Sequence, residues 1–354
     1  MTALKQSILR QIALQGPISV ADYMTLCLLH PQHGYYSTRD PLGRAGDFIT
    51  APEISQMFGE LLGLCLAQVW IAHGRPAPFT LAELGPGRGT LMVDLLRATR
   101  QVPGFHDSLR LHLVEASPVL RARQKDALAP HAPQFHDTAE SLPEATLFLI
   151  ANEFFDALPI RQFLRQGAGW AERVIWAEGD RLLFGLSPAA RLGALEHRTG
   201  DTEDGQMIET RPAADSVMAP INARIAAHGG CALIIDYGDW RSRGDTLQAL
   251  RAHEYDDPLA NPGAADLTAH VDFEALALAA PDLRATPLTP QGAFLERLGI
   301  GMRAEQLARH LDGPARESHL AAYRRLTHAE EMGHLFKVMG LTGRDAPPLP
   351  GFDV

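Results

Sequence analysis

Cysteine is scarce in this sequence of 354 residues. Three are present, Cys27, Cys65 and Cys231, and no pair has CxxC spacing. Such wide spacing supports neither a disulfide framework nor a zinc knuckle, and it is typical of a reducing compartment. The chain also lacks an apolar run near the ~20 residues that a membrane helix needs. We therefore expect a cytoplasmic protein without membrane insertion.

Positive charge is in deficit as well. Lys and Arg number 32 against 42 Asp and Glu, which gives a net charge of −10. This balance disfavours duplex nucleic acid as a partner, because neutralising phosphates supplies most of that affinity. It suits a cationic substrate or a basic partner instead. A hydrophobic content of 46% excludes wholesale disorder.

The fifteen histidines form no metal-binding motif. His30 and His33 lie close in sequence, but no carboxylate or cysteine supports them as metal ligands. We interpret this stretch as a turn and expect no metal. The length corresponds to roughly two domains, or to one large α/β domain with insertions. A homodimer is compatible with the sequence.

Residues 1–78 are expected to form a helical N-terminal extension. A first helix up to Gln15 is indicated by apolar residues at helical spacing: Leu4, Ile8, Leu9 and Ile12. Because it lacks the apolar core and cleavage site of a signal peptide, we take it as the first helix of the fold. Ser19 is a candidate N-cap for a second helix ending near Leu29. A third helix is predicted over 53–72.

The loop at 30–52 is long and carries aromatic residues, which is typical of a functional loop. We expect it to fold over a cofactor as a lid, with Asp47 and Thr50 as cofactor contacts. The alternative is simple packing of the helical extension against the sheet. The lid candidates are Tyr35, Tyr36, Gly46, Asp47, Phe48, Ile49 and Thr50.

From Phe79 onward, short apolar segments alternate with helical ones. The segments FTLAELG, LRLHLVEAS, PQFHD, ATLFLIANEF, CALIIDYG and HLFKVMGLT are predicted as strands. This alternation predicts parallel pairing in a doubly wound α/β sheet over 79–354. A hairpin at 170–186 interrupts the pattern, so we expect insertions at about 165–200 and 250–275. Further helices are predicted at 212–228, 293–300 and 303–310.

The sharpest local motif is a glycine turn between a predicted strand and helix. It reads Glu83-x-Gly85-x-Gly87-x-Gly89, and Thr90 occupies the position of the third glycine of a dinucleotide fingerprint. Thr90 therefore disfavours a nicotinamide oxidoreductase, and the missing Lys-Ser or Lys-Thr excludes a P-loop. The ExGxGxG pattern resembles the first motif of class I S-adenosylmethionine methyltransferases. The alternative is a tight turn that binds nothing.

Two acids follow the next predicted strands. Glu115 ends the second strand, 26 residues after Gly89. A carboxylate there can accept both hydroxyls of a ribose; the alternative is a solvated strand-end glutamate. Asp137 ends the third strand, where this fold often contacts the adenine amine, although an ordinary turn aspartate would look the same.

A series of blocks along nearly the whole chain resembles the MidA-like class I S-adenosylmethionine-dependent methyltransferases. This family includes the mitochondrial protein-arginine methyltransferase that assists assembly of respiratory complex I. The blocks are GPISVADYM, HGYYSTRDPLGRAGDFITAPEISQMFGELLG, LAELGPGRGTLMVDLLRA, VEASPVLRARQ, ANEFFDALPIRQF, LIIDYGD, DPLANPGAADLTAHVDF and MGHLFKVM.

The resemblance implies a Rossmann-like sheet of seven mostly parallel strands, with the helical extension and the hairpin added to it. It implies S-adenosylmethionine as cofactor and S-adenosylhomocysteine as product. Its most specific implication is a protein arginine as methyl acceptor, in a subunit of a respiratory complex. A methyltransferase of a small molecule and a non-catalytic cofactor-binding assembly factor are the alternatives.

The segment after the fourth strand carries the predicted chemistry. Asn152 could serve the amino-acid end of the cofactor, whereas Glu153 and Asp156 could hold a cationic acceptor between Phe154 and Phe155. Ligands bind beyond the carboxyl ends of strands in open α/β sheets, and paired carboxylates match a guanidinium. The alternative is a helix N-terminus, where acids favour the dipole and the aromatics belong to the core.

Other candidates lie further along the chain. Asp236 ends the strand CALIIDYG and is expected to join Glu153 and Asp156 as a catalytic carboxylate; the alternative is a turn cap. His253 is a candidate base, although a structural histidine is the more common case. Asp266 and His270 lie in a predicted helix start, which Asp266, Thr268 or Asp272 could cap, and we expect them to support the site at most.

Overall fold

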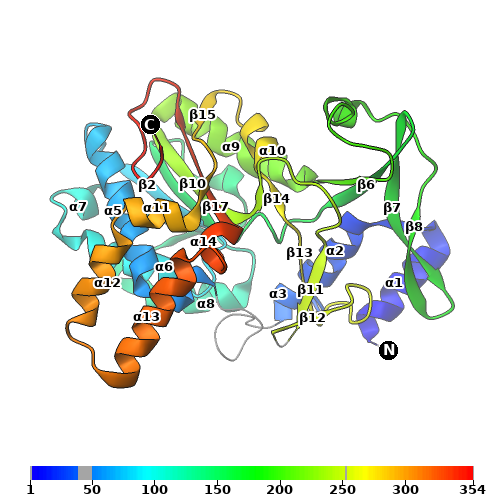
Figure 1. Cartoon of the computed structure of the whole chain (residues 1–354), viewed down its shortest axis with the longest axis horizontal. Coiled ribbons are helices and arrows are strands. Elements are labelled where there is room, and N and C mark those ends of the chain that lie inside the picture. Colours follow the sequence, from blue (N-terminus) through cyan, green and yellow to red (C-terminus); the bar gives the residue numbers. More distant parts are fainter. Residues whose placement is uncertain (1, 39–49, 252, 354) are drawn as a thin grey trace.

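The computed structural model describes residues 2–38, 50–251 and 253–353. A large sheet flanked by helices forms one half of the molecule in Figure 1, and a smaller sheet with the first helices forms the other. The two termini lie in different halves. None of the described helices has the length and apolar character to cross a bilayer.

The large sheet has the order β15-β17-β10-β5-β2-β3-β4 in the described part of the chain. Its strands are β2 (Phe79–Leu84), β3 (Leu109–Val114), β4 (Gln134–His136), β5 (Leu147–Asn152), β10 (Gly230–Asp239), β15 (Leu283–Ala285) and β17 (Phe336–Gly343). The neighbours from β4 to β10 pair in parallel, whereas β17 is antiparallel to β10 and β15. Two short strands, β14 (Val271–Asp272) and β16 (Thr289–Pro290), add to β10 and β17. The predicted mostly parallel α/β sheet is therefore confirmed, but with β14 and β16 it has nine strands in the described part of the chain and not the predicted seven.

The central strands are apolar because helices cover both of their faces. Every residue of β2 and β5 is buried, as expected for parallel strands in a doubly wound sheet. Leu81 and Phe148 face the cluster that holds α5 (Gln56–Ala72) and α6 (Thr90–Ala98). The alternating residues, such as Leu149, face α9 (Pro212–His228) and α10 (Phe273–Leu278).

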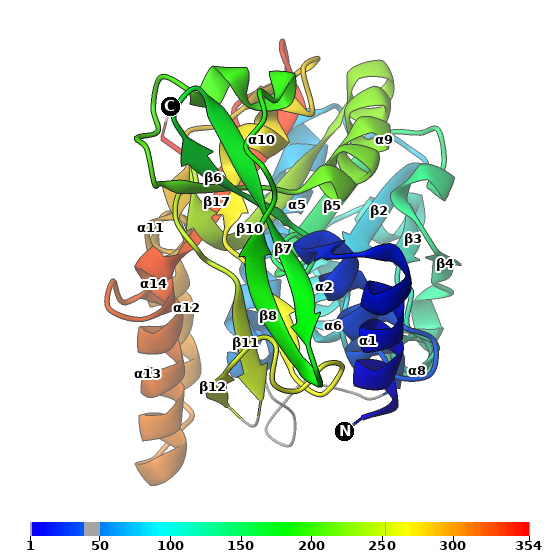
Figure 2. The same ribbon diagram turned by 90° about the vertical axis from the view of Figure 1, so that its right-hand side faces the viewer.

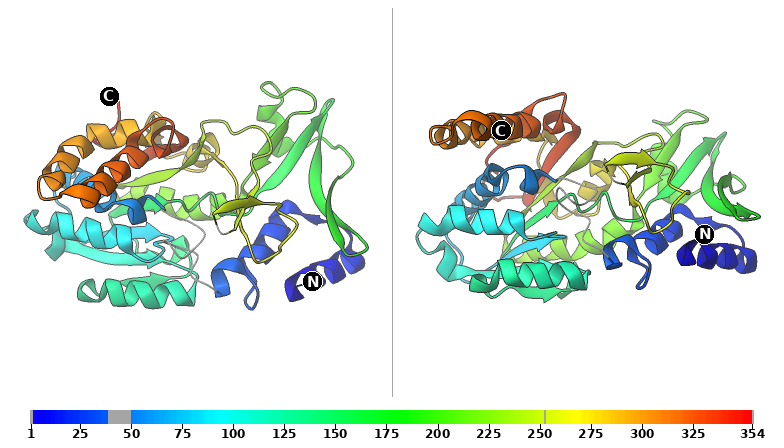
Figure 3. Two further views of the ribbon diagram at one scale, coloured as in Figure 1. Left: turned by 60° about the horizontal axis from the view of Figure 1, so that its bottom comes forward. Right: turned by 90° about the horizontal axis from the view of Figure 1, so that it is seen from below.

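The remaining helices lie around this sheet. They are α4 (Ala51–Ile54), α7 (Phe105–Ser108), α8 (Pro118–Ala127), α11 (Gln291–Arg297), α12 (Ile300–Ala308), α13 (Gly313–Thr327) and α14 (Met332–Leu335). In Figure 3 the C-terminal helices, drawn in orange, lie outside α5 on one side of the sheet. Helix α13 was not predicted, because Leu326 is its one buried residue and its apolar pattern is weak. The helix predicted over 53–72 is interrupted at Ser55, which caps α5.

The predicted hairpin is confirmed, but it belongs to a larger second sheet. This sheet has the order β1-β7-β6-β9, with β8 paired to β7. Its strands are β1 (Ile18–Ser19), β6 (Arg161–Gln166), β7 (Gly169–Glu178), β8 (Arg181–Leu186) and β9 (Met207–Thr210). Figure 2 shows the long β7–β8 hairpin crossing in front of the large sheet, with the N-terminal helices beside it.

The first helices pack with these inserted strands. Helices α1 (Ala3–Gln15), α2 (Val20–Leu29) and α3 (Tyr35–Thr38) share a core with Ile175 of β7. As predicted, Ser19 caps α2, and it forms a capping box with Asp22. By contrast, α5 packs in the core of the large sheet. Residues 1–78 thus contribute to two separate cores.

A third sheet corrects one prediction. It has the order β12-β11-β13, with β11 (Gln248–Arg251), β12 (Glu254–Asp256) and β13 (Asp266–Thr268). Of the three candidate caps in this segment, Asp272 caps the helix, which begins at Phe273, and its side chain accepts a hydrogen bond from the Ala275 amide. Asp266 is on a strand because Leu250 of β11 pairs with it, a partner that local capping patterns do not show.

Helices α5 and α6 pack closely through a glycine, and this contact yields a stability prediction. A Cβ atom on Gly63 would lie 2.8 Å from Cγ of Leu95. We therefore expect Gly63→Ala to lower the free energy of unfolding by about 1–3 kcal/mol, because overpacking forces neighbours to move. Chemical denaturation measures this change.

The control is Gly301→Ala on α12, where the nearest atom would be the flexible end of Glu296 at 3.3 Å. It should leave stability unchanged or raise it by up to about 1 kcal/mol, since alanine favours the helix. Equal stability of Gly63→Ala and the unsubstituted protein would contradict the predicted close approach.

Candidate functional site

A cavity of about 630 Å³ lies at the carboxyl ends of the central strands. The turn after β2, the ends of β3 and β5 and the first turns of α9 line this cavity. Tyr36 and Thr50 line it from the N-terminal region. Strand β2 pairs with β3 on one side and with β5 on the other, so the strand order reverses here. Open α/β sheets bind their ligands at this point.

The glycine turn has the conformation that its sequence predicts. Gly85, Gly87 and Gly89 have φ angles of 59°, 57° and 83°, in the left-handed region. A Cβ atom on Gly85 would lie 3.0 Å from the ring of Phe154. Gly85 and Gly87 line the cavity, whereas Gly89 does not line it and instead precedes the first turn of α6. The third glycine therefore serves the start of the helix.

Glu83 lies beneath this turn with an unsatisfied carboxylate oxygen. Its side chain is buried and lines the cavity, and Oε2 has no hydrogen-bond partner among the described residues. Burial, with a further contribution from Glu115, raises the pKa of Glu83 to about 8. Oδ1 of Asn152 is also buried without a described partner in the same cavity. Two such acceptors fit a ligand with a positively charged group that can donate several hydrogen bonds.

Glu115 is held in a fixed orientation at the end of β3. Its Oε1 accepts from the Ser117 amide at 2.8 Å, and its Oε2 accepts from Nε2 of Gln124 at 3.1 Å. The Gln124 amide also donates to the Gly87 carbonyl at 2.7 Å, so this side chain joins the acid to the glycine turn. Sequence analysis missed Gln124, whose only signal is a polar residue on the buried face of a helix.

The other predicted cofactor residues lie at the edges of the cavity. Asp137 is on the rim with its side chain 86% exposed, and it pairs with Arg121 at 2.5 Å. Thr50 lines the cavity and precedes α4. Asp47 lies outside the described residues, as do Gly46, Phe48 and Ile49 of the predicted lid. Of that loop, Tyr36 lines the cavity and Tyr35 is fully buried.

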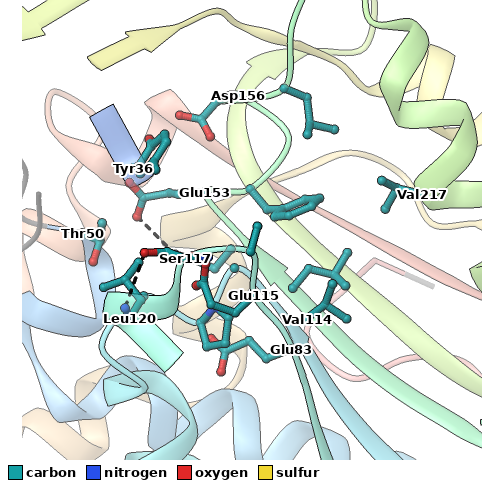
Figure 4. Close-up of a pocket in the computed structure, with 18 of the residues that line it drawn as sticks. Tyr36, Thr50, Glu83, Val114, Glu115, Ser117, Leu120, Glu153, Asp156 and Val217 are labelled. Atoms are coloured by element: carbon teal, nitrogen blue, oxygen red, sulfur yellow. Dashed lines mark hydrogen bonds between the residues drawn. The ribbon is translucent and has the colours of Figure 1, made fainter. Parts of the chain in front are cut away.

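Glu153 and Asp156 lie together at the opposite end of the cavity from Glu83 and Glu115 (Figure 4). Glu153 adopts a left-handed φ of 49°, which is costly for a side chain other than glycine. Its Oε1 accepts from the Ala51 amide and from Nδ2 of Asn152, each at 3.2 Å. Burial, followed by the charge of Asp156, raises the pKa of Glu153 to about 7.

Asp156 is 6% exposed and has one oxygen committed to a hydrogen bond. Its Oδ2 accepts from the Tyr237 hydroxyl at 2.9 Å, whereas Oδ1 has no partner among the described residues. Burial raises the pKa of this carboxyl group. A second oriented acceptor therefore faces the end of the cavity that Glu153 lines.

Asp236 does not lie where the sequence analysis expected it. Its side chain is fully buried and does not line the cavity. Its Oδ2 accepts from the amides of Phe155 and Asp156 at 3.0 and 3.2 Å, and its Oδ1 accepts from the Tyr237 amide at 3.0 Å. Asp236 thus shapes the loop that carries Asp156, and it does not line the cavity beside Glu153 and Asp156 as the sequence analysis expected.

The remaining candidates have different positions. His253 is exposed in the turn between β11 and β12, outside the cavity. His270 lies edge-on against the Tyr237 ring at 5.4 Å, and burial lowers its pKa. Phe154 lines the cavity, whereas Phe155 is fully buried in the core. Asp266, expected only to support the site, lines the cavity itself.

The described cavity lining is strongly acidic. One basic side chain, Arg88, stands against eight acids: Glu53, Glu83, Glu115, Asp137, Glu140, Glu153, Asp156 and Asp266. This charge favours cationic ligands. No group of three His, Cys, Asp or Glu side chains in the described ranges could hold a metal ion.

The doubly wound sheet, the glycine turn and the acid at the end of the next strand define a class I methyltransferase, with a cavity suited to a cationic cofactor. A family described as "Putative S-adenosyl-L-methionine-dependent methyltransferase" matches residues 61–291. The chain belongs to this family of S-adenosylmethionine-dependent methyltransferases, and the MidA-like resemblance is confirmed.

Relatives of known name and structure agree with this assignment. The chain is 36% identical to the mitochondrial protein arginine methyltransferase NDUFAF7 of Danio rerio, over 95% of this chain and 87% of that protein. It is 35% identical to the Homo sapiens protein, over 96% and 83%. A crystal structure of a COG1565 superfamily member from Burkholderia thailandensis, bound to S-adenosyl-homocysteine, matches with a TM-score of 0.84. That match has 30% identity and covers 99% of this chain and 94% of that one.

Gly87 provides a test of the cofactor loop. We expect Gly87→Val to abolish S-adenosylmethionine binding, measured by calorimetry, because its side chain would meet the ligand and the φ angle disfavours a branched residue. Gly179→Val is the matched control, since Gly179 has a φ of 62° in the β7–β8 turn, with nothing near its Cβ position. Retained affinity in Gly87→Val would show that another loop binds the cofactor.

Glu83 provides a pH test of the ligand-free protein. Its raised pKa means that the folded protein keeps a proton that the unfolded chain releases between pH 4.5 and about 8. The free energy of unfolding therefore falls as pH rises through this window, by up to about 1.4 kcal/mol per pH unit for one proton. Denaturation at several pH values should show a shallower slope for Glu83→Gln. The exposed Glu178→Gln should retain the original slope, and an unchanged slope in Glu83→Gln would contradict the prediction.

Proposed function

We propose that this enzyme transfers the methyl group of S-adenosylmethionine to an arginine side chain of a protein, in a subunit of a respiratory complex. The observation that carries this proposal is the pair of buried carboxylates, Glu153 and Asp156, at one end of an acidic cavity. The names of the relatives, which are protein arginine methyltransferases, support the same acceptor.

The opposite end of the cavity fits the cofactor. The orphaned oxygen of Glu83 would accept from its ammonium group, together with Oδ1 of Asn152. Glu115 would accept from the ribose hydroxyls, and Asp137 from the adenine amine. Gly85 and Gly87 would let the ligand approach the backbone, Gly89 supports the turn, and Thr50 would contact the ligand at the edge of the cavity. Asp47 is a further proposed cofactor contact. When bound, S-adenosylmethionine supplies an electrophilic methyl group on a positively charged sulfonium.

The acceptor chemistry explains why carboxylates are needed. A guanidinium is a cation without a basic lone pair, so it must be held and must lose a proton as the new N–C bond forms and the S–C bond breaks. Asp156, fixed by Tyr237, would orient the guanidinium in line with the methyl group. Glu153, with a pKa near 7, would take the proton.

The cellular setting is part of the same proposal. We infer a protein partner with a basic acceptor, no nucleic acid, a cytoplasmic location and a homodimer as the assembly to test. The relatives from Danio rerio and Homo sapiens carry the word mitochondrial in their names, so the compartment of this chain is a further measurement that tests the proposal.

Methyl transfer from labelled S-adenosylmethionine to lysate of a deletion strain tests the reaction. We expect label on arginine in a small number of proteins, and mass spectrometry of basic peptides from the deletion and parent strains identifies them. Label on small molecules alone would favour the small-molecule methyltransferase. Cofactor binding with no label would favour the non-catalytic assembly factor.

Asp156 tests the carboxylate assignment. Asp156→Asn should lower kcat about a hundredfold, because misplacing the acceptor relative to the methyl group costs on this scale, while S-adenosylhomocysteine still binds. The exposed Asp180→Asn, in the β7–β8 turn, removes the same charge and should retain full activity. Full activity of Asp156→Asn would remove this residue from the mechanism.

A further inference from the structure

Two tyrosine–aspartate pairs meet at the acceptor end of the cavity. The Tyr237 hydroxyl donates to Oδ2 of Asp156, and the Tyr36 hydroxyl donates to Oδ2 of Asp266, each at 2.9 Å. All four residues line the cavity. Asp266 is 3% exposed, so its carboxylate is withdrawn from bulk solvent like that of Asp156.

The two pairs are close to each other. Burial, followed by the charges of both Asp266 and Asp156, raises the pKa of Tyr36 well above its usual value, so this hydroxyl is near both acids. Figure 4 shows Tyr36 beside Glu153 and Asp156, away from Glu83 and Glu115. Asp266 therefore belongs to the acceptor end of the cavity and not to the cofactor end.

The segments that carry the two acids are tied together behind the cavity. The Ala269 amide donates to the Asp156 carbonyl at 3.0 Å. The guanidinium of Arg211 donates to the carbonyls of Leu158, Ala269 and His270 at 3.0–3.3 Å. Because these bonds link β13 to the loop after β5, the spacing of the two acids is set by backbone contacts.

Neighbouring rings restrain the two tyrosines. Tyr36 packs edge-on against the buried Tyr35 at 5.2 Å, and Tyr237 packs edge-on against Phe336 at 5.5 Å. Each carboxylate is thus oriented by a hydroxyl whose own ring is held in place. Such support preorganises a site for one ligand geometry.

We propose that Asp266, oriented by Tyr36, binds the acceptor cation together with Asp156 and makes the site selective for a planar guanidinium over an ammonium ion. The inference rests on the proposed function. A guanidinium presents N–H donors along two edges of a plane, which two separately oriented carboxylates can accept, whereas an ammonium is a compact point charge. Tyr36 is a positioning residue, acting through Asp266.

The test measures peptide binding by calorimetry to the full chain saturated with S-adenosylhomocysteine. The probes are three glycine heptapeptides whose central residue is arginine, lysine or citrulline, the last being a neutral mimic of arginine. The unsubstituted protein should bind the arginine peptide about tenfold or more tightly than either of the others, as expected for charge-assisted hydrogen bonds.

Asp266→Asn should weaken binding of the arginine peptide about tenfold or more. Its affinities for the citrulline peptide and for S-adenosylhomocysteine should stay within about twofold of those of the unsubstituted protein. Tyr36→Phe should also lower the ratio of arginine-peptide affinity to lysine-peptide affinity, but by a smaller factor than Asp266→Asn does. A general loosening of the fold would weaken all three peptides and leave this ratio unchanged. The control is Glu254→Gln, which removes one exposed acid from the same three-stranded sheet and should change nothing.

The outcomes separate the two proposals. If the unsubstituted protein does not prefer arginine over citrulline, the arginine acceptor of the proposed function fails together with this inference. If that preference holds and Asp266→Asn retains it, the inference alone is overturned. Loss of S-adenosylhomocysteine binding in a folded Asp266→Asn protein would also overturn it, because Asp266 would then belong to the cofactor end.

Discussion

The end of the cavity that Glu153 and Asp156 line depends on the carboxylate of Asp236, which lies within β10 and accepts hydrogen bonds from three backbone amides. Two of these amides belong to Phe155 and Asp156, so hydrogen bonds hold the loop after β5 against the neighbouring strand β10. This contact aims Asp156 into the cavity and leaves Glu153 in its strained left-handed conformation. An acid outside the cavity lining thereby positions two acids that line it.

Holding so many carboxylates in one cavity is costly, and the structure offsets the cost in two ways. Burial raises the pKa of Glu83, Glu153 and Asp156, so protonation can relieve part of the repulsion in the ligand-free enzyme. The buried guanidinium of Arg211 lies near Asp156 and Asp236 and supplies a permanent positive charge. Cationic ligands then complete the charge balance, which suits a site that combines a sulfonium with a basic acceptor.

Local patterns predicted the strands of the large sheet, the glycine turn and the N-cap at Ser19 well, because each of these leaves a pattern among residues that are neighbours in sequence. Prediction failed where the partner is distant. Asp266 reads as a helix cap in its own segment, but strand pairing with β11 and a hydroxyl from Tyr36 place it in the cavity. The sequence predicts Asp236 as a strand-end catalytic acid, but its Oδ2 accepts from two amides of the loop after β5 and its Oδ1 from the Tyr237 amide.

By itself the sequence determined the class of enzyme: the strand–turn–helix around Gly85 and Gly87, the acid at Glu115 and the blocks along the chain define the cofactor and the fold. Only the tertiary structure decided which acids line the cavity. Strand ends bring many carboxylates to one edge of a sheet, and sequence position does not tell which of them point into the cavity. That choice depends on hydrogen bonds between segments far apart in the chain, such as Tyr36 with Asp266 and Tyr237 with Asp156.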